Sequence, residues 1–188
     1  LLLLPLMILV AVAIRIESRG PCLYRAPRIG RDGVPFTMLK FRTMRVGSDQ
    51  WGALTRRNDR RVTRVGRFLR RTAIDEWPQF VNVARGEMAL VGPRPEDPRY
   101  VAKYTADQRR VLSVRPGVTS AASLAFRREE AVQLTGDDWE RIYTEQIMPA
   151  KLAMELACLD TAHWRTDLHV ISRTLLAVLT GGWRDRGC

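Results

Sequence analysis

The first fourteen residues are the most hydrophobic segment of the chain. Leu1 to Ile14 carry no charged or polar side chain, Pro5 interrupts them, and Arg15 supplies the first charge. The helix that this run predicts ends at Gly20-Pro21, because proline cannot continue a helix and glycine tolerates the exit conformation. Fourteen helical residues rise about 21 Å and a hydrocarbon core is about 30 Å thick, so the run is too short to span a bilayer but can enter one.

We expect residues 1–19 to be the second half of a membrane helix, because the chain starts without Met and inside an apolar run. A helix buried in a soluble core and a signal peptide are the alternatives; a signal peptide has its basic residues before the apolar run, not after it. The positive-inside rule then predicts that residues 20–188 lie on the cytoplasmic side of the membrane. The basic residues behind this prediction are Arg15, Arg19, Arg25, Arg28 and Arg31.

A β-hairpin is the predicted element after the apolar helix. Residues 22–28 and 36–43 are short extended-type runs, and turn formers lie between them at Gly30, Asp32-Gly33 and Pro35. Residues 44–60 lack periodicity and predict a loop. No repeat, low-complexity tract or linker interrupts the chain, so we expect one domain over 1–188.

Helices dominate the rest of the prediction. Thr63 is a candidate N-cap for a helix with Val65, Phe68 and Leu69 on one face. Asp75-Glu76-Trp77-Pro78 resembles a helix start, and that helix continues to Gly86. Further helices are predicted from Thr105 to Val114, opened by a capping box with Gln108, from Asp137 past Met148 with a bend at Pro149, and from Thr166 to Leu179. The fold class is therefore α+β, mainly helical with a small β-hairpin.

The charge balance is strongly basic and indicates a polyanionic partner. Lys and Arg number 31 against 20 Asp and Glu, a formal charge of +11. A nucleic-acid-binding module is an alternative on charge alone, but the arginines are interleaved with glycine, proline and acidic residues, and no recognition helix emerges. Cys22, Cys158 and Cys188 are too widely spaced for a disulfide framework or a zinc site, which favours a reducing compartment.

Asp75 and Glu76 are the first candidates for chemistry. An aspartate at a helix N-terminus is kept ionised by the helix dipole and can act as a nucleophile or metal ligand. Ordinary helix capping explains the same pair, and spacing alone leaves both interpretations open. Arg70 and Arg71 precede the pair, and Arg94 follows between two prolines. Guanidinium groups bind phosphate bidentately, so carboxylates among arginines indicate a phosphate ester handled with a divalent metal.

Several motifs follow one another through the middle of the chain. They are Arg28-Ile-Gly-Arg31-x-Gly33, Lys40-Phe-Arg-Thr-Met44, Asp59-Arg-Arg-Val-Thr-Arg-Val-Gly66-Arg-Phe-Leu-Arg70, Asp75-Glu76-x-Pro78-Gln79, Asn82-Val83, Gly86-Glu-Met88, Val91-Gly-Pro-Arg-Pro95 and Arg115-Pro-Gly-Val-Thr119. This succession resembles the bacterial sugar transferases, which are monotopic polyprenol-phosphate phosphoglycosyl transferases. The resemblance runs in order from about residue 5 to the end of the chain.

The resemblance implies a two-step transfer. Asp75 is implied as the nucleophile that attacks the sugar-bearing phosphate of a UDP-sugar, releases UMP and holds an aspartyl phosphosugar until polyprenol (undecaprenyl) phosphate accepts it. Mg²⁺ held by Asp75 and Glu76 neutralises charge on the diphosphate oxygens. The implied place is the cytoplasmic face of the bacterial inner membrane, at the start of exopolysaccharide or glycoconjugate assembly. The partners are then the two substrates and the lipid bilayer, without nucleic acid, and a homo-oligomer stays open.

Further residues enter only through the resemblance. Lys40, Arg70, Arg94 and Arg127 match positions that contact phosphate, and Asp167 takes the acidic position before the last helix without an assigned role. The resemblance also implies that the apolar helix is re-entrant and broken by a Ser-Pro pair.

Two segments depart from the pattern of the family. Leu4-Pro5 stands in place of the Ser-Pro pair, and the segment from Ser120 to Phe126 replaces the commoner Gly-x-x-Gln-x-x-Gly. The sugar donor is therefore not predicted. An inactive membrane-surface scaffold is a further alternative, and the intact Asp75-Glu76 pair argues against it.

Overall fold

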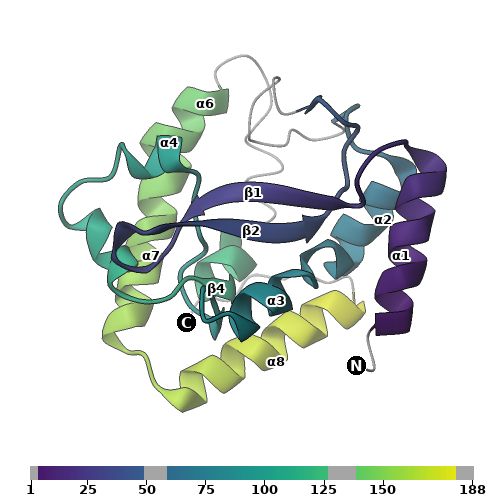
Figure 1. The fold of residues 1–188 in the computed structure, drawn as a ribbon. Helices are drawn as coiled ribbons and strands as arrows, with labels where there is room; N and C mark the ends of the chain where they lie inside the picture. Colours follow the sequence, from purple (N-terminus) through teal and green to yellow (C-terminus); the bar gives the residue numbers. More distant parts are fainter. Residues whose placement is uncertain (1–3, 49–58, 127–138, 181–188) are drawn as a thin grey trace.

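The computed structural model describes residues 4–48, 59–126 and 139–180, and Figure 1 shows their arrangement. In chain order the elements are α1 (Leu4–Glu17), β1 (Leu23–Ile29), η1 (Arg31–Gly33), β2 (Pro35–Phe41), α2 (Arg64–Thr72), η3 (Ile74–Glu76), α3 (Gln79–Ala84), β3 (Ala89–Val91), α4 (Pro98–Val101), η4 (Gln108–Ser113), β4 (Gly117–Thr119), α6 (Trp139–Ile142), η5 (Tyr143–Ile147), α7 (Met148–Asp160) and α8 (Trp164–Thr180). The fold is mixed helix and strand and mainly helical, as predicted.

The apolar helix α1 packs beside α2 at one end of the hairpin (Figure 1). Val10 and Ile14 form a buried cluster with Phe41 of β2 and Leu69 of α2. Among the helices that the structure describes, none has both the length and the apolar composition needed to cross a membrane.

The predicted hairpin is confirmed. β1 and β2 pair antiparallel from Leu23 opposite Phe41 to Ile29 opposite Pro35, and η1 forms the turn. Because side chains alternate along a strand, Ala26 and the facing Met38 both enter the core, where they contact Met88. Of the loop predicted for residues 44–60, residues 49–58 lie outside the described residues.

The start of α2 also follows the prediction. The Thr63 hydroxyl accepts a hydrogen bond from the Gly66 N–H at 2.9 Å and so caps the helix. A Cβ atom at Gly66 would lie 2.1 Å from the carbonyl oxygen of Thr43. Glycine is thus required where α2 packs directly on the backbone that follows β2.

α3 is joined to the edge of β2 by the hydrogen bonds of one buried side chain. Asn82 donates through Nδ2 to the Thr37 carbonyl at 2.8 Å and accepts through Oδ1 from the Leu39 N–H at 3.0 Å. These are the groups that a third strand would otherwise pair. A helix therefore covers the edge of the hairpin and carries the preceding η3 turn next to β2.

A second, two-stranded sheet was not predicted. β3 and β4 pair in parallel, with Ala89 opposite Gly117 and Val91 opposite Thr119. A Cβ atom at Gly117 would lie 2.2 Å from the backbone nitrogen of Gly92, so the two segments approach at glycine. Strands of three residues leave too short a pattern for detection in the sequence.

The C-terminal helices agree with the prediction in position but not in every detail. The Thr105–Gln108 capping box is present, with reciprocal bonds of 2.9 and 3.3 Å, but it precedes a 3₁₀ helix. The long helix changes to π-helical geometry over Tyr143–Ile147, just before Pro149. Proline has no N–H for the helical ladder, which accounts for an irregularity at this place. α7 packs on η4, and α8 packs against β3, β4 and α2.

Candidate active site

A cavity of about 2710 Å³ opens between the hairpin, α2, the η3 turn and α8. Basic side chains from separate elements line it, together with the acidic pair of η3. They include Arg28 of β1, Lys40 of β2, Arg70 of α2, Arg94 after β3 and Lys151 of α7. Such a basic cavity suits a polyanionic ligand such as a diphosphate.

Asp75 and Glu76 both line this cavity. The prediction that they begin an α-helix is wrong, because they lie in a 3₁₀ turn. Ala73 adopts a left-handed conformation (φ 55°), which ends α2 and starts the 3₁₀ turn Ile74–Glu76. Pro78 has no N–H to extend that turn, and α3 begins only at Gln79. The dipole argument for Asp75 therefore fails, and the turn geometry itself directs the pair toward the cavity.

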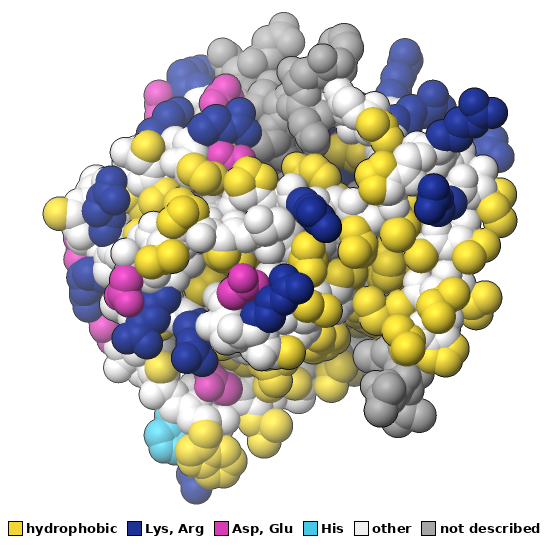
Figure 2. Space-filling view, viewed as in Figure 1, with side chains coloured by type: hydrophobic (Ala, Val, Ile, Leu, Met, Phe, Trp, Pro, Cys, Tyr) yellow, Lys and Arg dark blue, Asp and Glu magenta, His cyan; other side chains and the backbone are white. Residues whose placement is uncertain are grey.

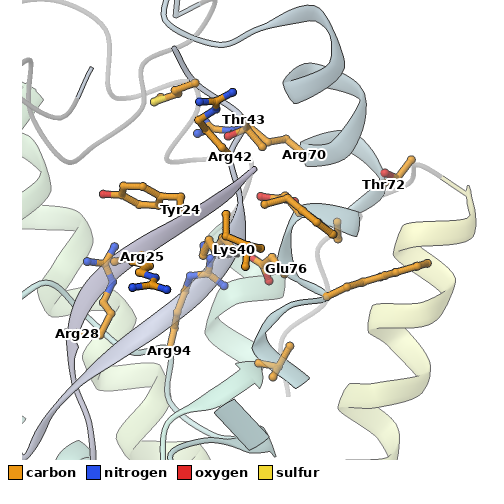
Figure 3. Close-up of a pocket in the computed structure, with 18 of the residues that line it drawn as sticks. Tyr24, Arg25, Arg28, Lys40, Arg42, Thr43, Arg70, Thr72, Glu76 and Arg94 are labelled. Carbon is orange, nitrogen blue, oxygen red and sulfur yellow. Dashed lines mark hydrogen bonds and ion pairs between the residues drawn. The ribbon is translucent and has the colours of Figure 1, made fainter. Parts of the chain in front are cut away.

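Glu76 is the centre of a charge cluster that three distant segments build (Figure 3). Its Oε1 atom lies 2.6 Å from Nη2 of Arg94 and 3.4 Å from Nζ of Lys40. All three side chains are largely removed from solvent, with exposures between 15 and 33%. The pairs therefore interact more strongly than they would on an open surface.

Lys40 reaches the cluster because of strand alternation. It stands two residues after the buried Met38 on the same face of β2, at the level where the core gives way to the cavity. Burial lowers the pKa of Lys40 to about 8; the carboxylates of Glu76 and Asp75 act in the opposite direction, and Arg94 and Arg28 add to the lowering.

Arg94 projects from a turn that two prolines stiffen. The turn is held on one side by the Pro93 carbonyl, which accepts from the Gly117 N–H at 2.9 Å. On the other side, the Glu96 carbonyl accepts from the Ile29 N–H at 3.2 Å. The Arg94 side chain thus extends from a backbone that is fixed between β1 and β4, and its guanidinium forms an ion pair with Glu76.

Arg70 lines the same cavity from α2. Its Nε donates to the Thr43 hydroxyl at 2.8 Å, which orients the guanidinium across the end of β2. Figure 3 shows Arg70 and Thr43 on one side of the cavity, and Arg28 and Arg94 on the other.

A comparison with known protein families shows which family the chain belongs to. The model of a family described as bacterial sugar transferase matches residues 1–181, nearly the whole chain. The chain belongs to the bacterial sugar transferase family.

Relatives with assigned names agree with this membership. A UDP-glucose:undecaprenyl-phosphate glucose-1-phosphate transferase of Caulobacter vibrioides is 40% identical over 189 residues, which cover 94% of this chain and 63% of that protein. An undecaprenyl-phosphate glucose phosphotransferase of Komagataeibacter xylinus is 45% identical over 150 residues, 73% of this chain and 27% of that protein. The chain thus spans less than two thirds of the length of these curated relatives.

A third relative has a different sugar in its name. It is a UDP-N-acetylgalactosamine-undecaprenyl-phosphate N-acetylgalactosaminephosphotransferase of Aeromonas hydrophila, 41% identical over 126 residues that cover 64% of this chain and 29% of that protein. Relatives named for glucose and for N-acetylgalactosamine thus match this chain at similar identity.

The structure brings most of the site residues predicted from the sequence together. Asp75, Glu76, Lys40, Arg70 and Arg94 all line the one cavity. The remaining two candidates are placed differently. Arg127 lies outside the described residues. Asp167 was expected before the last helix but lies in the first turn of α8, because that helix begins earlier, at Trp164; its side chain is exposed and is not among the residues that line the cavity.

The sequence analysis assigned no site role to Lys151, nor to Arg28, which begins the first motif of the resemblance. Arg28 shares a face of β1 with the buried Ala26, and its guanidinium lies 3.5 Å from Asp97. Strand alternation from Ala26 was a signal that could have found it. Lys151 comes from α7, far along the chain, and no local pattern distinguishes it from a surface lysine.

Asp75 and Glu76 are the residues that could hold Mg²⁺ in this cavity. Mg²⁺ is usually bound by one or two protein carboxylates together with substrate phosphates. Two neighbouring carboxylates that line a basic cavity fit this donor set. Across residues 4–48, 59–126 and 139–180, no group of three or more His, Cys, Asp or Glu side chains forms a metal site.

Proposed function

We propose that the protein transfers a phosphosugar from a UDP-sugar to polyprenol phosphate, undecaprenyl phosphate in bacteria, and releases UMP. The observation that carries this proposal is the convergence of Asp75 and Glu76 with Lys40 and Arg94 in one basic cavity. The names of the relatives support the choice of substrates. The reaction would begin the assembly of an exopolysaccharide or glycoconjugate.

In the first step, a carboxylate oxygen of Asp75 attacks the phosphorus atom that bears the sugar. The bond from this phosphorus to the bridging oxygen breaks, and UMP leaves with the electron pair. The product is an aspartyl phosphosugar. Asp75 is only 8% exposed, which limits competing attack by water, and Lys40 and Arg94 can bind the phosphate oxygens as charge develops.

In the second step, a phosphate oxygen of polyprenol phosphate attacks the same phosphorus. The bond to Asp75 breaks, the carboxylate is restored, and a polyprenol diphosphate sugar leaves. Because UMP departs before the lipid reacts, the kinetics are ping-pong.

Asp75 and Glu76 would hold Mg²⁺ against the diphosphate of the donor. When bound, the ion neutralises charge on the transferring and leaving oxygens. Glu76 also orients Lys40 and Arg94, because both contact its Oε1 atom.

We propose that the protein docks on the cytoplasmic face of the inner membrane. Its exposed apolar surface supports this location. Figure 2 shows hydrophobic side chains gathered over the α1 side of the molecule. Exposed large apolar residues of α1 are Leu4, Leu6, Ile8, Leu9, Val12 and Ile16, and those of α2, α3 and α8 include Phe68, Phe80, Trp164, Leu168, Leu175 and Leu176. A surface of this kind exceeds what scattered exposed apolar residues explain.

The cavity and this apolar surface share residues. Phe68, Phe80 and Leu175 line the cavity, and each is more than 40% exposed. The cavity therefore opens where a lipid tail would stay in an apolar environment while its phosphate reaches Asp75. This arrangement supports a lipid-linked acceptor over a water-soluble one.

The experiment that tests the proposal is UMP release without acceptor. With the correct UDP-sugar and Mg²⁺, the protein in detergent should release UMP in a burst no larger than the enzyme present and gain the mass of one phosphosugar. Polyprenol phosphate should then remove the adduct. Asp75→Asn should abolish both burst and adduct because an amide is a poor nucleophile. Asp160→Asn, an exposed position on α7, is the matched control and should keep both.

A different mechanism gives different results. If the lipid phosphate attacks the donor directly in a ternary complex, neither burst nor adduct forms, although turnover with both substrates is normal. That outcome would remove the aspartyl intermediate and leave the transfer. Absence of UMP release from every UDP-sugar tried, with and without lipid, would contradict the transfer itself.

A further inference from the structure

The turn that carries Arg94 has a single backbone donor. Pro93 and Pro95 have no N–H, so between Gly92 and Glu96 only Arg94 can donate from the main chain. That N–H points to Oε1 of Glu155 on α7, 61 residues further along the chain, at 3.5 Å. A side chain from a distant helix therefore holds the one position from which the Arg94 guanidinium extends.

Glu155 is a buried carboxylate for which the proposed transfer has no chemical step. It is 6% exposed, and burial raises its pKa, while the bonds from Ser120 and Arg94 and the charges of Lys151 and Arg94 oppose this. A carboxylate in this position costs free energy compared with an apolar side chain of similar size. Packing alone therefore does not account for an acidic residue here.

The same oxygen atom of Glu155 also binds the segment that follows β4. The Ser120 hydroxyl donates to Oε1 at 2.6 Å and accepts from the Ser123 N–H at 2.9 Å, so it caps the helical residues 121–126. Ser123, Leu124 and Phe126 of this segment line the cavity. One carboxylate oxygen thus joins the Arg94 turn to a second wall of the cavity.

We propose that Glu155 is a positioning residue of the transfer reaction, which acts by accepting the Arg94 N–H and so directs the Arg94 guanidinium onto Glu76. The inference rests on the proposed function. This positioning role requires a hydrogen-bond acceptor at Glu155, not a negative charge. The hydrogen bond fixes the backbone, and the Arg94 guanidinium supplies the electrostatic interaction with Glu76.

A pair of near-isosteric variants separates acceptor from charge. Glu155→Met removes the acceptor, and we expect kcat for UMP release to fall at least tenfold with KM changed less than threefold. Glu155→Gln keeps a carbonyl acceptor, and we expect kcat within threefold of wild type. Glu145→Gln, an exposed acid in the same helical region, is the control and should leave kcat unchanged. Equal losses in Glu155→Met and Glu155→Gln, or no loss in Glu155→Met, would overturn the proposal.

A double-mutant cycle tests whether Glu155 acts through Arg94. In an Arg94→Ala background the guanidinium is absent, so Glu155→Met should lower kcat by less than twofold further. An additive tenfold loss would show that Glu155 acts by another route and would overturn the inference.

Hydrogen exchange gives a readout that does not depend on activity. The peptide that contains residues 92–96 should exchange faster in Glu155→Met than in wild type or Glu155→Gln, because the Arg94 N–H has lost its acceptor. Unchanged exchange in that peptide would overturn the inference whatever the activity. Failure of the wild type to release UMP would instead contradict the proposed function, so the two failures are distinguishable.

Discussion

Glu17, the last residue of α1, caps the first turn of α2 at Arg64. Its Oε1 atom accepts from the Arg64 N–H at 2.6 Å, and its Oε2 atom accepts from the neighbouring Val65 N–H at 2.7 Å. The N–H groups of a first helical turn have no partner within the helix and attract negative charge. The apolar N-terminal helix is therefore joined through one carboxylate to the helix that carries Arg70 and leads to Asp75.

Removing this cap should lower stability in a pH-dependent way. We expect Glu17→Ala to lower the free energy of unfolding by about 1 kcal/mol at pH 7. Burial acts to raise the pKa of Glu17, but the bonds from Val65 and Arg64 outweigh it and lower that pKa below 4.5. The contribution is thus present above pH 4.5 and lost as the pH falls through the lower folded-state pKa.

Chemical denaturation in detergent at several pH values measures this effect. The difference between wild type and Glu17→Ala should shrink as the solution is acidified below pH 4.5. Glu145→Ala, at an exposed acid paired with Arg141, should differ from wild type by less than about 0.5 kcal/mol. A Glu17→Ala effect of equal size at pH 7 and pH 3 would rule out the charged cap.

Arg94→Lys should lower activity at least tenfold, about 1.4 kcal/mol of activation free energy. The prolines and Glu155 fix the backbone of Arg94, so a lysine cannot move to recover the 2.6 Å contact with Glu76 and bidentate phosphate binding together. Steady-state UMP release measures the loss, with Arg110→Lys at an exposed arginine as the control. Unchanged turnover would limit Arg94 to a structural role in the turn.

The buried Lys40 should give the reaction an alkaline limit. Its pKa of about 8 means that the ammonium group is lost as the pH rises through 8, and kcat/KM should fall there because the unligated enzyme loses a phosphate-binding charge. Between pH 8 and 10.5 the unfolded chain binds the extra proton, so stability should rise with pH over this range. Lys40→Arg should move the activity limit upward, and an identical limit in that variant would assign it to another group.

The apolar surface should bind membranes through α8 as well as α1. Deleting residues 1–14 should release the protein from membranes only partly, but Val10 and Ile14 are buried and their loss can also unfold the protein. The double variant Leu168→Ser and Leu176→Ser leaves that packing intact and should weaken liposome binding about tenfold, about 1.4 kcal/mol. Val34→Ser, at an exposed position in the hairpin turn, should have no effect in the same flotation assay.

Caps and turns that depend on neighbouring residues could be predicted from the sequence alone. The Thr63 cap, the Thr105–Gln108 capping box and the hairpin turn all depend on residues within a few positions of one another, and the structure confirms each. The motifs also indicate the family, which the family comparison confirms, and they singled out Asp75 and Glu76, which do line the cavity. Local rules were wrong where a single backbone conformation decided the outcome, as at Ala73, whose positive φ no pattern signals for a non-glycine residue.

The assembly of the site depends on contacts between distant segments. Lys40, Glu76 and Arg94 lie on three separate segments of the chain, and the Arg94 turn is held by Glu155, 61 residues further along. The three-residue strands β3 and β4 pair in parallel across 25 intervening residues, and neither pattern nor propensity marks them. Local sequence specifies turns, caps and amphipathic faces because neighbouring residues determine their energies. Which carboxylate meets which guanidinium depends on how those elements pack, and only the tertiary structure decides it.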